Sequence, residues 1–181
     1  MKPGTKLIFK LLYVLSWIIF VGICIEAGAF ITNAVFALAK PTAVKYLMQV
    51  VDLSDLLKYD HRYFFSMTLL MSIVAMMKAW LFYQIIKILH DKKLSLSQPF
   101  NKEVERFIFK ISYLSLAIGF FSFWGVKYTE WLVKQGVKMP DIQYLRLGGA
   151  DVWLFMGVSL FVIAQIFKRG IEIQSENELT V

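Results

Sequence analysis

The sequence has little charge and almost no cysteine. Charged residues make up 18% of its 181 positions, whereas an average soluble domain has about 25%. Cys24 is the only cysteine, which excludes an intramolecular disulfide and a metal cluster ligated by cysteines. The two histidines, His61 and His90, lie on opposite sides of the membrane in the topology derived below. We therefore expect no metal site and no cofactor.

Complete catalytic motifs are also missing. The sequence contains no nucleophile elbow around a serine, no zinc-binding pair of histidines and no phosphate-cradling glycine loop. Its aspartates all lie outside the long apolar runs, which argues against catalysis by aspartates inside a membrane. We therefore predict that the protein is not an enzyme.

Apolar residues are present in excess. Hydrophobic residues make up 58% of the chain, and the mean hydropathy is +0.60. They are collected into four runs, at residues 11–38, 63–89, 107–126 and 152–167. A helix that crosses a bilayer needs about 20 predominantly apolar residues. The sequence therefore predicts an all-α membrane protein, with one domain formed by a bundle of four transmembrane helices.

The distribution of basic residues predicts the orientation of these helices. The net charge of +7 could suggest contact with nucleic acid, but the Lys and Arg residues flank the apolar runs. Eleven of them lie on the side that holds both termini, and eight lie on the other side. Because cytoplasmic loops are enriched in Lys and Arg, we predict that both termini are cytoplasmic. We expect no direct contact with nucleic acid.

The two outer connections, at residues 40–62 and 127–151, are too long for simple turns. Within residues 44–57 apolar side chains recur at helical spacing, which predicts a short amphipathic helix. This helix either lies on the outer membrane surface or caps the end of the bundle.

Two ionisable residues interrupt the apolar runs. Glu26 shares a helix face with Gly22, Ala29 and Asn33, a small and polar stripe that predicts contact with other helices. Glu26 lies about 24 Å from the cytoplasmic end of its run and Lys78 about 13 Å, so a direct bridge would need tilted or offset helices. The pair could form a buried site for transport or sensing. Alternatively, Glu26 lies in water near the outer interface, which we favour, and Lys78 snorkels or bonds to backbone carbonyls.

The third run contains a ridge of small residues. Ser112, Ser115, Gly119 and Ser122 follow a 3-4-3 spacing, which aligns them along one side of a helix. Such ridges allow close helix packing in lipid, and a hydroxyl-lined conduit is the alternative.

The cytoplasmic side carries two short strand-like pieces. Leu94 and Leu96 alternate with serines, Pro99 then blocks helix propagation, and Asn101 is suited to cap the helix that follows. The last residues form the second piece. We predict that the two pieces together form a docking surface, built from Leu94, Leu96, Pro99, Phe100, Asn101, Glu176, Leu179 and Val181.

Short motifs on the predicted cytoplasmic side resemble those of a known protein family. Pro99-Phe100 before the third run, Ile166 to Gly170, and Glu176 to Val181 resemble a bacterial family of small four-span integral membrane proteins of unknown function. The resemblance implies a bacterial cytoplasmic (inner) membrane. Members of this family are often encoded beside helix-turn-helix regulators of the Xre type, which implies a regulatory protein as partner.

Our leading prediction is a non-enzymatic membrane protein whose cytoplasmic loop and tail bind another protein. The alternatives are a small transporter or channel that uses Glu26 and Lys78, and a structural subunit of a membrane complex. A homo-oligomer is compatible with each of the three.

Overall fold

The computed structural model describes residues 3–39, 51–91 and 101–178, and these residues contain helices and no strands. The elements are α1 (Pro3–Ala39), α3 (Ser54–Tyr59), α4 (His61–His90), α5 (Lys102–Lys134) and α6 (Ala150–Glu178). The four longer helices are long and apolar enough to cross a membrane. The predicted all-α membrane class is therefore confirmed, and each predicted run lies within one of these four helices.

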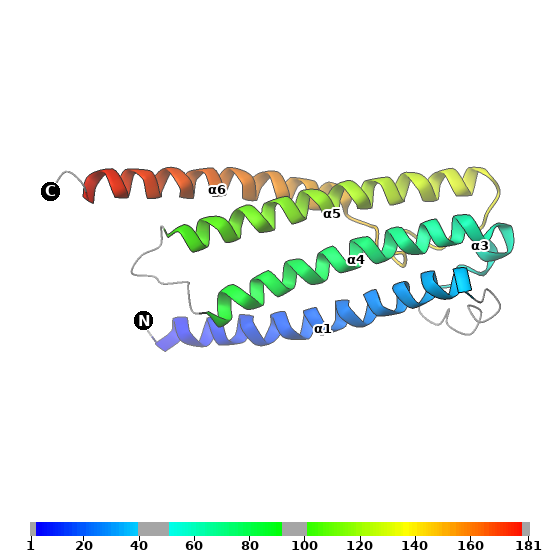
Figure 1. The fold of residues 1–181 in the computed structure, drawn as a ribbon, viewed down its shortest axis with the longest axis horizontal. Helices are drawn as coiled ribbons and strands as arrows, with labels where there is room; N and C mark the ends of the chain where they lie inside the picture. The colour runs from blue at the N-terminus through cyan, green and yellow to red at the C-terminus, as the bar shows by residue number, and fades with distance from the viewer. Residues whose placement is uncertain (1–2, 40–50, 92–100, 179–181) are drawn as a thin grey trace.

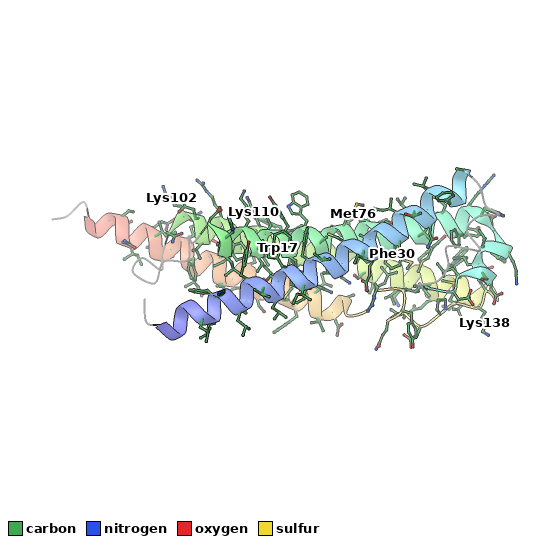
Figure 2. All side chains as sticks on the ribbon, turned by 90° about the horizontal axis from the view of Figure 1, so that it is seen from below. Trp17, Phe30, Met76, Lys102, Lys110 and Lys138 are labelled. Atoms are coloured by element: carbon green, nitrogen blue, oxygen red, sulfur yellow. The ribbon has the colours of Figure 1, made fainter. Side chains whose placement is uncertain are left out.

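The four long helices lie in the order α1, α4, α5, α6 across the molecule (Figure 1). Neighbours are antiparallel: on α1 and α4, the ring centroids of Tyr13 and His90 lie 6.0 Å apart, and those of Phe20 and Tyr83 lie 6.3 Å apart. After a quarter turn, α1 is seen to run along most of the molecule (Figure 2). Both termini lie at one end, called here the terminal end, and α3 lies at the opposite, distal end (Figure 1).

Short polar side chains begin two of these helices. The Asp60 carboxylate accepts a hydrogen bond from the backbone N–H of Arg62 at 2.7 Å, before α4. The Asn101 side chain accepts one from the backbone N–H of Val104 at 2.8 Å, before α5. Such bonds satisfy N–H groups that have no partner in the first helical turn. The predicted capping role of Asn101 is confirmed.

Two helices continue past the apolar runs that predicted them. α5 extends to Lys134 and α6 extends to Glu178, because charged residues are good helix formers even where hydropathy falls. Ion pairs at i,i+3 spacing support both extensions, with 2.9 Å between Lys127 and Glu130 and 3.0 Å between Arg169 and Glu172.

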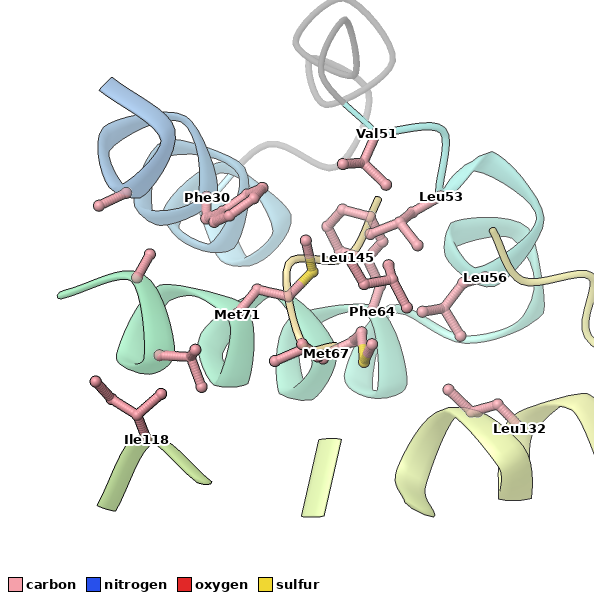
Figure 3. Close-up of a cluster of buried hydrophobic side chains, with 14 of the residues drawn as sticks. Phe30, Val51, Leu53, Leu56, Phe64, Met67, Met71, Ile118, Leu132 and Leu145 are labelled. Atoms are coloured by element: carbon pink, nitrogen blue, oxygen red, sulfur yellow. The ribbon is translucent and has the colours of Figure 1, made fainter. Parts of the chain in front are cut away.

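The distal end holds most of the fully buried apolar side chains. Leu56 and Leu57 of α3 are buried, while Asp55 and Lys58 of the same helix are exposed. Figure 3 shows Leu56 near Phe64, in a cluster of buried side chains from several elements. The amphipathic helix therefore caps the bundle over residues 54–59, and residues 40–50 of that connection lie outside the described residues.

The connection between α5 and α6, residues 135–149, folds back along the molecule and is called here the return segment. Figure 1 shows that α6 starts well inside the ends of α5. Leu145 and Leu147 of the return segment are fully buried. A Cβ at Gly125 of α5 would lie 2.7 Å from Leu147 and 3.0 Å from Leu70 of α4. The return segment thus packs against α4 and α5 in the distal half of the molecule.

Close approach of backbones joins α5 to α6. The Ser112 hydroxyl of α5 donates to the carbonyl of Gly157 of α6 at 2.8 Å. A Cβ at Gly157 would lie 2.9 Å from the backbone nitrogen of Leu116, and one at Gly119 would lie 3.0 Å from that of Leu154. Because backbone atoms cannot move aside as a flexible side chain can, both positions require glycine.

We expect Gly157→Ala to lower the free energy of unfolding by about 1–3 kcal/mol, the usual cost of overpacking. The measurement is unfolding by denaturing detergent of the protein in mild micelles, followed by circular dichroism. Gly22→Ala is the matched control, because nothing lies within 4 Å of a Cβ at Gly22. That change should be neutral or stabilise by up to about 1 kcal/mol through helix propensity. Equal stability of the two variants would contradict the close approach.

Candidate functional site

Three charged residues from separate parts of the chain meet in the molecule. An oxygen of Glu26 on α1 lies 2.6 Å from a guanidinium nitrogen of Arg146 in the return segment. The Lys78 ammonium on α4 donates to the backbone carbonyl of Arg146 at 2.8 Å. The same ammonium lies 5.6 Å from the ring centroid of Trp153 on α6. These four residues are called here the charge cluster.

The backbone conformation of Arg146 explains how this residue bonds to both Glu26 and Lys78. Arg146 has a φ of 59°, in the left-handed region that few non-glycine residues adopt. This conformation lets its side chain reach α1 while its carbonyl accepts from α4. Gly149 follows with a φ of 75°, and its carbonyl accepts from the backbone N–H of Trp153 at 3.0 Å in the first turn of α6. The cluster is therefore tied to the beginning of α6.

Each charged side chain of the cluster has a partner within the molecule. The Glu26 carboxylate faces a cation, and the Lys78 ammonium has a carbonyl and an aromatic face as partners, which attract cations. The side chains of Arg146 and Glu26 are 55% and 31% exposed, so the cluster reaches the protein surface. Since α6 begins at Ala150, the cluster lies level with the start of the apolar run of α6.

The sequence singled out Glu26 and Lys78 but not Arg146. No ion pair joins Glu26 directly to Lys78 among the described residues, and Arg146 links them instead. Arg146 was missed because it lies in an outer connection, where an arginine is ordinary. One signal was available: it stands between Leu145 and Leu147, and two leucines flanking a charge in a loop indicate a segment that packs into the protein.

The other residues of the stripe predicted on α1 lie in different surroundings. Asn33 is buried, and its side-chain oxygen has no hydrogen-bond partner among the described residues. Ala29 is half-buried, while Gly22 is exposed, and nothing lies within 4 Å of a Cβ placed at Gly22. The buried face of α1 includes Ala27, Phe30 and Ala34 as well as Asn33.

The small-residue ridge of α5 lies at the protein interior. Ser112, Ser115 and Ser122 are fully buried, and Gly119 is also buried. The Ser115 hydroxyl donates to the carbonyl of Ile111 at 2.8 Å, within its own helix. The Ser122 hydroxyl has no partner among the described residues.

Most of the predicted docking residues fall in the two segments, predicted to be cytoplasmic, next to the described helices. Leu94, Leu96, Pro99, Phe100, Leu179 and Val181 lie outside the described residues. Glu176 is exposed and lies in α6. The helix thus continues through residues 175–178, which were predicted to lead into a strand-like piece, because helical hydrogen bonding propagates through the polar tail.

Among the residues that the structure describes, no group of three His, Cys, Asp or Glu side chains could hold a metal ion. The charge cluster, with one carboxylate and two cations, offers a single anionic ligand group.

Comparison with known proteins places the chain in a family. A family model described as "Protein of unknown function (DUF2975)" matches residues 42–181. The chain belongs to this family. The matched residues include Lys78, Arg146 and Trp153 of the charge cluster, while Glu26 precedes them. No curated protein and no solved structure matches the chain.

We expect Arg146→Met to lower the free energy of unfolding by about 1–2 kcal/mol, because it removes a charge-assisted hydrogen bond from the partly exposed Glu26 carboxylate. Unfolding in detergent micelles measures this change. Arg169→Met is the matched control, since Arg169 also pairs with a glutamate, at 3.0 Å, but within its own helix and with both side chains more exposed than those of Arg146 and Glu26. Its expected loss is below about 0.5 kcal/mol.

Adding Glu26→Gln to Arg146→Met should recover part of the lost stability, because the unpaired carboxylate is then gone. A double variant as unstable as the sum of both single variants would show that the ion pair contributes nothing.

Proposed function

We propose that this is a non-enzymatic protein of the bacterial inner membrane that docks a soluble regulatory protein through the end of α6. The observation that carries the proposal is the projection of α6 past α5 at the terminal end (Figure 1). Side chains there are mostly exposed from Lys168 to Glu176. Beyond the packed part of the molecule, the described side chains of α6 are not buried by this chain. A bound partner would bury them.

The exposed face of α6 is suited to lipid along most of the helix and to water near its C-terminal end. Phe155, Val158, Val162 and Ile166 are exposed at helical spacing, which suits contact with lipid. Lys168 and Arg169 then mark the membrane surface, where basic residues gather. Ile173 continues the same face beyond them and is 47% exposed. An apolar side chain on an exposed helix outside the membrane is suited to anchor a partner in a groove.

The charge of the tail indicates the chemistry of the partner. Residues 170–181 contain three glutamates and no Lys or Arg. Such a segment complements a basic surface and repels an acidic one. A helix-turn-helix regulator carries a basic surface for DNA, so the partner that the family resemblance implies also fits by charge.

The charge cluster supports this proposal better than it supports transport. Glu26 and Lys78 have partners within the molecule, so a transported ion would have to displace Arg146. We assign the cluster the role of anchoring the return segment, and with it the start of α6, to α1 and α4.

A photo-cross-linking amino acid in place of Ile173 should capture a soluble protein in the native cell, identified by mass spectrometry. The matched control replaces Val162, which is 53% exposed and lies about three turns earlier on the same face. From position 162 we expect adducts with lipid only.

The same protein captured from both positions, or none from position 173, would contradict docking at the end of α6. A second copy of this chain captured from position 173 would also overturn it, in favour of a homo-oligomer.

A further inference from the structure

A small pocket opens between α4 and α5 at the terminal end of the molecule. It has a volume of about 170 Å³, and three basic side chains line it: Lys87 from α4, and Arg106 and Lys110 from α5. Figure 2 shows Lys110 in the terminal half of the molecule, with Lys102 at the start of the same helix. The pocket lies far along the helices from the charge cluster and shares no residue with it.

The three cations of this pocket form no ion pair within the part of the chain that the structure describes. No ion pair joins Lys87, Arg106 or Lys110 to a carboxylate among the described residues, and all three are exposed. Arg106 and Lys110 stand at i,i+4 on one face of α5, a spacing at which like charges repel. Lys87 adds a third positive charge from the facing helix. An anion bound among them would remove this repulsion.

Two carboxylates also line the pocket, those of Asp91 and Glu103. Asp91 directly follows α4 and has an interaction partner of its own. Glu103 lies in the first turn of α5, where the positive end of the helix dipole stabilises a carboxylate. With three cations and two carboxylates in its lining, the pocket keeps a net positive charge.

The walls of the pocket suit a ligand that is both charged and apolar. Ile88 is buried and Phe107 is half-buried beside the three cations. The apolar run of α4 ends beside the pocket and that of α5 begins there, so it lies at a membrane surface, predicted to be the cytoplasmic one. Basic pockets between transmembrane helices on that side suit anionic headgroups. We propose that this pocket binds the phosphate of an anionic phospholipid headgroup.

Native mass spectrometry of the purified full chain tests the proposal, by titration with phosphatidylglycerol, phosphatidylcholine or phosphatidylethanolamine in detergent. We expect phosphatidylglycerol to bind about tenfold more tightly than either zwitterionic lipid. The variant Lys87→Gln, Arg106→Gln, Lys110→Gln should lose about a hundredfold in affinity for it, and Lys110→Gln alone about fivefold. The single variant keeps the test informative if the triple variant does not fold.

The matched control removes three charges at the distal end: Lys58→Gln, Lys134→Gln, Lys138→Gln. Its affinity for phosphatidylglycerol should change less than about twofold, since none of the three lines the pocket. Equal losses in both triple variants would overturn the proposal, because only net charge would matter.

Inorganic phosphate distinguishes a lipid headgroup from a free anion. We expect millimolar phosphate to leave bound phosphatidylglycerol in place, because the apolar walls add to the affinity for lipid. The proposal would be overturned if phosphate alone displaced phosphatidylglycerol. It would also be overturned if the zwitterionic lipids bound as tightly as phosphatidylglycerol.

Discussion

The contact of Arg146 with α1 and α4 is the interaction on which the rest of the arrangement depends. Its side chain pairs with Glu26, and its carbonyl accepts from Lys78. These bonds hold the return segment inside the distal half of the molecule, next to the buried Leu145 and Leu147. Because α6 begins immediately after this segment, the contact also determines how far α6 reaches at the other end. An anchor at the distal end thus sets the projection at the terminal end.

The two ends of the molecule have different physical characters. At the distal end, α3 and the return segment cover the helices and bury leucines, so that this end is closed by apolar packing. At the terminal end, α6 projects with exposed side chains, and basic residues line an open pocket between α4 and α5. Buried apolar contacts are therefore concentrated at the distal end, and exposed groups suited to bind other molecules are concentrated at the terminal end.

The middle of the molecule follows the rules of packing in lipid. Lipid tails are as apolar as leucine, so helices associate through close approach and hydrogen bonds rather than through the hydrophobic effect. Gly119, Gly157 and Ser112 provide both between α5 and α6. The helices α4 and α5 bury more of their surface than α1 and α6, which lie at the edges of the row. The exposed apolar side chains of the edge helices are therefore expected to face lipid.

The sequence by itself determined the number of long helices and their approximate positions, because a bilayer demands long apolar runs and leaves the backbone no alternative to helical hydrogen bonding. It also determined the cap at Asn101, since capping depends on a few neighbouring residues. Tertiary structure decided that Glu26 and Lys78 share Arg146, that the return segment folds inward and that α6 projects. Contacts between residues as far apart in the sequence as Glu26 and Arg146 depend on how whole helices are placed relative to one another. Hydropathy along the chain does not predict that placement.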